Sequence, residues 1–201
     1  MQASTSRGAP TSHPLYRVWS YWYVKHDPGV EWEESLKEMT TFDSIESFWA
    51  VQSHLQLPSK LGQEDDYFVF REGIRPMWEH PMNVNGGRFV IKYQMDCRIK
   101  DKDAQMDDYK ERLDGSWLEM LMAMLGEQYG DEGDKICGAA ACIRKRVAKL
   151  CLWTSDATDK DTNDKIEAVL RSKLKLPKSV KIGYELHTSA ANRQAVHGRG
   201  K

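Results

Sequence analysis

The chain has 201 residues, with 29 Lys and Arg against 30 Asp and Glu, so its formal net charge is −1. A chain of this length is expected to form one domain with a substantial core. The balanced charge excludes a protein that coats polyanions over its whole surface, although it leaves room for a local basic patch.

Strand and helix signals alternate along the chain. Strands are expected where aromatic and β-branched residues gather, and helices where apolar residues recur every three or four positions. In chain order, the expected elements are a strand at 16–25, a helix at 42–57, strands at 66–70 and 88–95, a helix at 114–130, a hairpin of 138–146 and 148–154, a helix at 162–176 and a strand at 180–187. Asp43, with Glu46 at capping-box spacing, and Asp114 are the expected N-caps of the first two helices, and Pro177 ends the third. This order predicts an α+β fold with helices on one face of a sheet.

The two ends of the chain are polar. Residues 1–12 and 188–201 are expected to be flexible arms around one domain at 13–187. The first arm lacks the apolar segment of a signal peptide, and no run of about 18 apolar residues exists, which argues against secretion and membrane spanning.

Four cysteines, at 97, 137, 142 and 151, form no CxxC pair, and the six histidines are scattered. This spacing does not fit a zinc site. We therefore expect small buried thiols in a reducing cytosolic compartment, with no metal and no cofactor.

Motifs of common enzyme classes are missing from the sequence. It has no GxSxG, no P-loop, no GxGxxG after a strand and no HExxH. Glu119 and Glu127 lie on one predicted helix, where a pair of catalytic carboxylates and ordinary solvated charges are the alternatives. The second is the simpler interpretation, so the sequence favours a binding protein over an enzyme.

The stretch "IRPMWEHPM" at 74–82 places Trp78 directly against Glu79 between two prolines. Proline fixes its own φ and moves the preceding residue out of the helical region, so we expect a stiff, irregular loop. Trp32, in the turn-rich "PGVEWEESL", is a second loop indole. Two such indoles can hold a flat ring between them, while Glu79 accepts hydrogen bonds from an edge with two donors, as guanine has. A cationic ring would add about 2 kcal/mol of cation–π energy to about 1–3 kcal/mol per stacked base.

A basic cluster follows in the predicted hairpin and consists of Arg144, Lys145, Arg146 and Lys149. Alternation along a strand would place Arg144 and Arg146 on the same face, where their guanidinium groups suit phosphates. Trp153 lies four residues after Lys149.

Together these stretches resemble the translation initiation factor 4E family, the messenger RNA cap-binding proteins. The resemblance runs from His13 to about His187 and is carried by "HPLYRVWSYWY", "FDSIESFWAV", "GIRPMWE", "GGRFVIK", "SWLEMLMAMLGE" and "KLCLWT". It implies a curved, mostly antiparallel β-sheet with about three α-helices on its convex back and a cap-binding cleft on its concave side.

The function implied by the resemblance is to bind the 7-methylguanosine cap of mRNA and to recruit a scaffold protein for translation initiation. The cytoplasm is the implied location, with the nucleus as a further one. A cap-binding repressor or storage factor with a different partner set is the alternative, and an enzyme acting on methylated nucleotides is a third, weaker one.

The resemblance also assigns roles to single residues. Trp32 and Trp78 match the indoles that sandwich 7-methylguanine, and Glu79 matches the carboxylate that pairs with its N1 and N2 groups. The backbone N–H of Trp78 is expected to reach O6, and Trp153 matches the residue near the N7 methyl group. The matches to phosphate-binding positions are Arg144, Arg146 and Lys149, with Arg88 in support.

A second surface implied by the resemblance binds partners that carry a Tyr, four variable residues, a Leu and a hydrophobic residue. The matching positions on the helical back are His13, Pro14, Leu15, Ile45, Trp49, Leu118, Glu119 and Met122. The pattern alone favours Ile45 and Trp49 as core, whereas the resemblance makes Trp49 the central anchor of a helix-in-groove contact. The remaining tryptophans Trp19, Trp22 and Trp117 are expected in the core.

The sequence departs from the family pattern at several positions. Phe89 stands where many relatives have Trp, and Cys142 where an Asn is common. In the basic hairpin, Val147 and Ala148 replace Gly and Asp, and Arg146 replaces Lys, which changes the donor geometry toward phosphates. A further basic set, expected as a solvated face or a contact to RNA beyond the cap, is Lys173, Lys175, Lys178 and Lys181.

Overall fold

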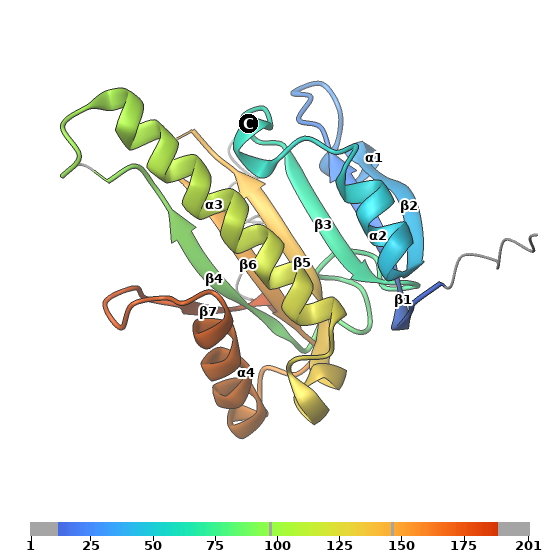
Figure 1. Ribbon diagram of the computed structural model, residues 1–201. Helices are drawn as coiled ribbons and strands as arrows, with labels where there is room; N and C mark the ends of the chain where they lie inside the picture. The colour runs from blue at the N-terminus through green and yellow to red at the C-terminus, as the bar shows by residue number, and fades with distance from the viewer. Residues whose placement is uncertain (1–11, 97, 146, 189–201) are drawn as a thin grey trace, which may run out of the picture.

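Seven strands form a single sheet in the part of the chain that the computed structural model describes, residues 12–188 except 97 and 146 (Figure 1). The strands are β1 (Pro14–Val24), β2 (Leu36–Ser44), β3 (Asp66–Arg71), β4 (Gly87–Tyr93), β5 (Ile136–Ile143), β6 (Ala148–Thr154) and β7 (Gly183–Leu186). Their order across the sheet is β2-β1-β3-β5-β6-β4-β7, and every neighbouring pair is antiparallel. The predicted α+β class with a curved antiparallel sheet is confirmed.

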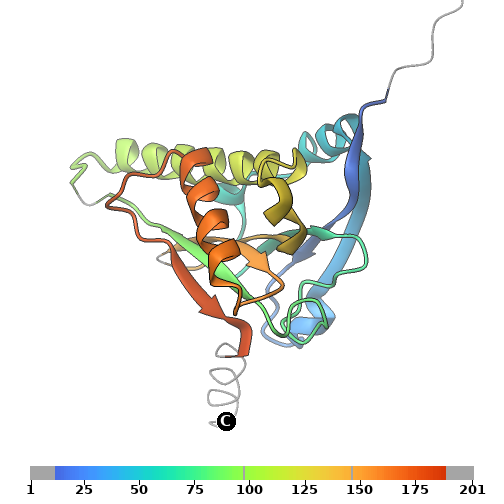
Figure 2. The same ribbon diagram turned by 90° about the horizontal axis from the view of Figure 1, so that it is seen from below.

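The longer helices pack against one face of this sheet, as Figure 2 shows for α3. The helices are α1 (Trp32–Ser35), α2 (Ile45–Gln52), α3 (Lys102–Leu125) and α4 (Lys160–Lys173), with short 3-10 turns η1 (Pro58–Lys60) and η2 (Gly130–Lys135). No helix in the described ranges is both long and apolar enough to cross a membrane.

The core has two parts because successive strand residues point to opposite faces of the sheet. Between the sheet and the helices, Trp19 and Trp117 are each only 1% exposed, in agreement with their predicted core positions. On the other face, a smaller cluster includes Phe68, Phe70 and Trp153, with Trp22 partly buried against it. This second cluster forms the base of the cleft described below.

The central strand β5 is built from small residues, "ICGAAACI", and all of them are buried. Small side chains let neighbouring layers approach closely. At Gly138 a Cβ atom would collide with the ring of Phe70 on β3, so glycine is required there.

Strand β2 was not predicted, and its presence corrects the first helix. The segment "LKEMTTFDS" pairs with β1 and buries Leu36 and Phe42. The helix α2 therefore begins at Ile45 with Ser44, not Asp43, as its N-cap. The Ser44 hydroxyl accepts a hydrogen bond from the N–H of Ser47, and the Ser47 hydroxyl accepts one from the N–H of Ser44. Expecting the helix to start at Asp43 was wrong because a serine pair forms the capping box.

The second helix also starts earlier than predicted. Asp101 caps α3 by accepting hydrogen bonds from the N–H groups of Asp103 and Ala104. Asp114, the expected cap, lies inside α3 and accepts from the backbone N–H and hydroxyl of Ser59 at 2.9 and 2.6 Å. The first half of α3 is too polar to show the apolar period on which the prediction depended.

The basic hairpin turns between Arg144 and Val147, whose backbones exchange hydrogen bonds of 3.2 and 3.3 Å. Arg144 therefore belongs to the turn and not to strand β5, which ends at Ile143. The predicted common strand face of Arg144 and Arg146 does not apply to Arg144, and Arg146 lies outside the described residues.

Candidate functional site: a cleft on the concave face

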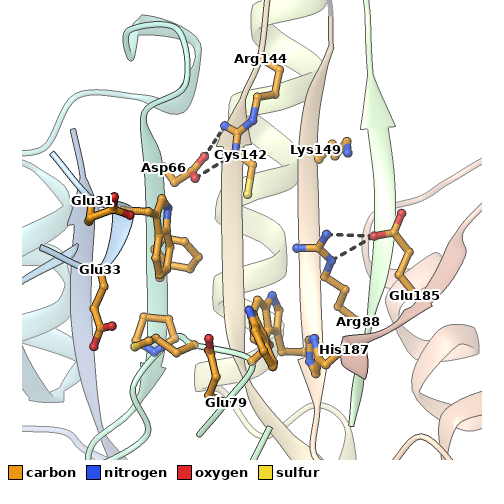
Figure 3. A pocket seen from close by; sticks show the side chains of 16 residues that line it. Glu31, Glu33, Asp66, Glu79, Arg88, Cys142, Arg144, Lys149, Glu185 and His187 are labelled. Carbon is orange, nitrogen blue, oxygen red and sulfur yellow. Dashed lines mark hydrogen bonds and ion pairs between the residues drawn. The ribbon is translucent and has the colours of Figure 1, made fainter. Parts of the chain in front are cut away.

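A cleft of about 560 Å³ opens on the face of the sheet opposite the long helices (Figure 3). The residues that line it are Glu31, Trp32, Glu33, Asp66, Phe68, Pro76, Met77, Trp78, Glu79, Arg88, Cys142, Arg144, Lys149, Trp153, Glu185 and His187. Aromatic, acidic and basic groups thus share one cavity that is assembled from strands, from α1 and from the loop between β3 and β4.

The sheet side of the cleft consists of three rows of side chains that run across neighbouring strands. The first row is Phe70, Gly138, Trp153, Arg88 and Glu185; the second is Phe68, Ala140, Cys151, Val90 and Gly183; the third is Asp66, Cys142, Lys149 and Lys92. Each row lies two residues further along every strand, so successive rows are about 6–7 Å apart. The sheet thereby places Trp153 beside Arg88 in the first row and Lys149 two rows further along the strands.

The two loop indoles are held from different elements. Trp32 begins α1, is 42% exposed and touches the edge of Phe68, with ring centroids 6.1 Å apart at 85°. Trp78 is half-buried and packs on the smaller core cluster. Both indoles therefore contact the concave cluster and line the cleft.

The loop that carries Trp78 is stabilised from beneath. The fully buried Asn83 donates its side-chain amide to the carbonyls of Arg75 and Met77 at 3.1 and 2.7 Å. Hydrogen bonds to two carbonyls fix the path of the proline-bounded segment, as the sequence predicted for a stiff loop.

An ion pair joins this loop to α1. Nη1 of Arg75 lies 3.0 Å from Oε1 of Glu33, and Nη2 donates to the Glu33 carbonyl at 3.4 Å. Trp32 precedes Glu33, and Trp78 lies three residues after Arg75. The pair therefore links the two segments that carry the indoles.

Glu79 lies in the cleft beside Trp78 and is exposed (Figure 3). Within the described residues it takes part in no hydrogen bond or ion pair. Its carboxylate is therefore available to accept hydrogen bonds from a ligand.

At the opposite end of the cleft, the guanidinium of Arg144 binds Asp66 bidentately, at 2.6 and 3.0 Å (Figure 3). Asp66 is only 2% exposed. Burial raises the pKa of this carboxyl, and the ion pair with Arg144 limits that rise. Burial lowers the pKa of Arg144, but its hydrogen bond and charge interaction with Asp66 outweigh burial and raise it. The pair holds Arg144 charged and fixed in orientation.

Arg88 is held in the same way by Glu185, through Nη2 at 2.9 Å and Nε at 3.3 Å. Its guanidinium carbon also lies 5.9 Å from the centre of the Trp153 ring. Lys149, between the two arginines, has no ion pair with any described residue. This end of the cleft therefore presents two oriented guanidinium groups and an ammonium group.

Trp153 stacks against His187, with ring centroids 4.1 Å apart and 36° between the planes. Burial, together with the charge of Arg88, lowers the pKa of His187 to about 4. The imidazole is therefore neutral near pH 7, and an uncharged aromatic pair forms this wall of the cleft.

Three cysteines are free and buried: Cys137, Cys142 and Cys151. This agrees with the predicted buried thiols, and Cys97 lies outside the described residues. Cys142 lines the cleft next to Asp66, and its interaction with the thiol of Cys151, together with burial, raises its pKa well above its usual value. A neutral thiol occupies this position.

The comparisons with known proteins agree with this arrangement. A family model described as eukaryotic initiation factor 4E matches residues 14–199. The chain belongs to the eukaryotic initiation factor 4E family.

Similar proteins of the family come from nematodes. Eukaryotic translation initiation factor 4E-3 of Caenorhabditis elegans is 42% identical over 183 residues, covering 91% of this chain and 70% of that protein. A structure of C. elegans eIF4E-3 with the 4E-binding protein Mextli has a TM-score of 0.83 at 41% identity, covering 90% of this chain and 97% of that one. Ascaris suum eIF4E-3 in complex with the m7G cap gives a TM-score of 0.80 at 40% identity, with 88% and 92% covered.

The structure brings most of the predicted cap-site residues of this family member into the one cleft. These are Trp32, Trp78, Glu79, Trp153, Arg144, Lys149 and Arg88. Arg146, the remaining predicted position, lies outside the described residues.

The predicted partner-binding residues lie on α2, on α3, on β1 and, for His13, just before β1, and none of them lines the cleft. Ile45 is 46% exposed, and Trp49 and Met122 are each 42% exposed. His13, Pro14 and Glu119 are also exposed, while Leu15 and Leu118 are half-buried against the core. The alternative that Ile45 and Trp49 are core residues is therefore wrong.

The N-terminal segment is tied to α2 on this helix face. The N–H of Ile45 donates to the carbonyl of His13 at 2.9 Å, and both the backbone and the ring of His13 contact the Glu46 carboxylate. The residues before β1 therefore lie next to the start of α2.

Sequence reasoning missed several cleft residues. Glu185 and His187 occur in "GYELH", where alternation places both on the same face, so a signal was available. Glu33 and Arg75 are 42 positions apart, and no local pattern indicates that they meet.

Proposed function

We propose that this protein binds the 7-methylguanosine cap of mRNA in the concave cleft and recruits a scaffold initiation factor on its helix face. The observation that carries the proposal is that Trp32, Trp78 and Glu79 line one cleft with Arg88, Arg144 and Lys149, and that Glu79 and Arg144 lie at opposite ends of it (Figure 3). A cap consists of a flat, positively charged base followed by negatively charged phosphates, and the cleft presents groups suited to each part in that order.

The base is held by stacking and by its edge. Trp32 and Trp78 take the ring of 7-methylguanine between them, which contributes about 1–3 kcal/mol per stacked base. Glu79 accepts from the N1–H and the exocyclic amine, and charge-assisted bonds of this kind are stronger than neutral ones. Trp153, backed by neutral His187, offers an uncharged surface to the N7 methyl group.

The charge of the methylated base explains how the cleft selects it over guanine. Glu31 and Glu33 flank Trp32 in the sequence, Glu79 follows Trp78, and all three carboxylates line the cleft. A cationic ring gains from these carboxylates and from cation–π contact with the indoles. Unmethylated guanine presents the same edge without the positive charge.

The phosphates are held by oriented cations. Asp66 and Glu185 fix the planes of Arg144 and Arg88, so little side-chain freedom is lost when a phosphate binds. Lys149 adds a point charge between them. Although the hairpin sequence differs from the family pattern, Arg88, Arg144 and Lys149 all line the cleft.

Two relatives support the two halves of the proposal. The Ascaris suum eIF4E-3 structure contains the m7G cap, and the C. elegans eIF4E-3 structure contains the 4E-binding protein Mextli. The exposed Trp49 and Ile45 provide apolar anchors for a partner with the Tyr-x4-Leu-hydrophobic motif. A protein with this function acts in the cytoplasm and performs no chemical step on the cap.

A retention experiment tests this function. Purified protein is bound to 7-methyl-GTP resin and eluted with free 7-methyl-GTP or with GTP at equal concentration. We expect elution by the methylated nucleotide only. Equal elution by both nucleotides, or conversion of the eluting cap analogue to a product, would contradict the proposal.

A further inference from the structure

The concave face carries a second lysine beside Lys149. Lys92 on β4 lies directly opposite Lys149 on β6, at the end of the third row. Side chains in such positions begin about 4.5–5.5 Å apart at Cβ, and like charges there destabilise the sheet. Within the described residues, neither lysine forms an ion pair.

The third row is uneven in charge. At its β3 end, the buried carboxylate of Asp66 is matched by Arg144. At its β4 end lie the half-buried Lys149 and the exposed Lys92, and neither forms an ion pair with a carboxylate among the described residues. An anion placed there would remove the repulsion and accept hydrogen bonds from both side chains.

The sheet leaves this end of the row open. The pairing of β7 with β4 ends at Val90 opposite Gly183, one row before Lys92. Lys92 is exposed, whereas Lys149 lines the cleft. An extended ligand that leaves the cleft over Lys149 toward the β4 edge therefore passes Lys92 next.

We propose that Lys92, acting with Lys149, binds the first phosphodiester of the RNA beyond the triphosphate bridge of the cap. This inference rests on the proposed cap binding, which places the cap phosphates at Arg88, Arg144 and Lys149. The occupant is an RNA strand because the RNA is covalently continuous with the cap and leaves the cleft where the unpaired cations are. Lys92 would then extend the site from the cap to the transcript.

Three ligands separate this role from cap binding itself: 7-methyl-GTP, the dinucleotide cap m7GpppA, and a capped RNA of five nucleotides. Affinities are measured for wild type and Lys92→Ala at several salt concentrations. We expect Lys92→Ala to bind the first two ligands like wild type and to lose about threefold to tenfold in affinity for the capped RNA. For that RNA, the slope of log K against log salt concentration should become shallower by about 0.7, the value for one single-strand phosphate contact.

Two variants serve as controls. Lys37→Ala removes an exposed strand lysine opposite Tyr23, which packs on the helix side of the sheet, and should leave all three affinities unchanged. Lys92→Arg should retain binding of the capped RNA.

Because a like-charge pair is removed, the melting temperature of Lys92→Ala should be about 1 °C higher than that of wild type.

The outcomes distinguish the two proposals. Unchanged affinity of Lys92→Ala for the capped RNA would overturn the role of Lys92, and so would an equal loss for 7-methyl-GTP. A wild-type protein that binds 7-methyl-GTP no better than GTP would instead overturn the proposed cap binding.

Discussion

At the scale of single residues, the charged side chains at the two ends of the cleft differ in whether they already have a partner in the protein. Glu79 is exposed and has no partner among the described residues, so its carboxylate is free for a ligand. Arg144 and Arg88 are each bound by a carboxylate before any phosphate arrives. The base end therefore offers an open acceptor, and the phosphate end offers donors that are already oriented.

Replacing Glu79 by Gln keeps its size and removes its charge. Hydrogen bonds to charged groups contribute about 1.5–3 kcal/mol, so Glu79→Gln should weaken 7-methyl-GTP binding about 10-fold to 100-fold. GTP binding should change less, because the lost attraction to a cationic ring does not apply to it. Calorimetric titration measures both affinities.

The matched control is Glu34→Gln, an exposed carboxylate on α1 that does not line the cleft. It should bind like wild type. Similar losses in the two variants would mean that the general negative charge of this region, and not the position of Glu79, attracts the base.

His187 predicts a dependence of stability on pH. Its pKa falls from 6.5 to about 4 in the folded protein, so the unfolded chain binds more protons between these values. The stabilisation is complete above pH 6.5 and is lost as the pH falls toward 4. Between pH 7 and pH 5, wild type should lose about 2 kcal/mol of unfolding free energy through this group.

Denaturant unfolding of wild type and His187→Gln at pH 7 and pH 5 checks this value. Whatever the stability of the variant at each pH, its loss of unfolding free energy between pH 7 and pH 5 should be smaller than that of wild type by about 2 kcal/mol. An equal pH dependence in both proteins would mean that His187 titrates normally.

At the scale of elements, the indoles are positioned by contact between α1 and the loop after β3. The Arg75–Glu33 ion pair is the direct link, and its side chains are 42% and 57% exposed. Exposed pairs contribute about 0–1 kcal/mol to stability. The contribution we expect is therefore to the spacing of Trp32 and Trp78 and not to folding.

Arg75→Gln should leave the melting temperature nearly unchanged and weaken 7-methyl-GTP binding a few-fold, since ordering the segments then costs affinity. Glu33→Gln should behave in the same way. The charge-exchanged double variant Arg75→Glu with Glu33→Arg should recover most of the affinity. Additive losses in that double variant would show that the pair does not position the indoles.

The elements also show what the sequence can and cannot predict. Aromatic and β-branched residues identified β1, β3 and β4, and β5 and β6 were predicted as the two strands of a hairpin. The polar strand β2 was missed because only Leu36 and Phe42 enter the core. The indoles and Glu79 were predicted from their local context, whereas Asp66 and Glu185 were missed because their partners come from distant strands.

At the scale of the whole molecule, one sheet separates two surfaces. Successive side chains along each strand point alternately toward the helices and toward the cleft. Residues two positions apart therefore face the same surface, and the residue between them faces the other. Helix α2, which carries Trp49, lies on the helix side of the sheet (Figure 1), whereas Trp32 and Trp78 line the cleft. Mutations on one face should therefore leave the other largely intact.

Trp49→Ala tests this separation. Because the indole is 42% exposed, its removal should abolish binding of a Tyr-x4-Leu peptide while retention on 7-methyl-GTP resin stays unchanged. Peptide binding by fluorescence anisotropy and resin retention measure the two faces in parallel. Loss of both activities would indicate misfolding or coupling between the faces.

The most direct measurement of the central claim is a tryptophan-fluorescence titration with 7-methyl-GTP and with GTP at two salt concentrations. The account predicts strong quenching by the methylated nucleotide, because it stacks between Trp32 and Trp78, with affinity that falls as salt rises. GTP should quench only at much higher concentration. Equal quenching by both nucleotides, or none by either, would contradict the proposal that this cleft binds the cap.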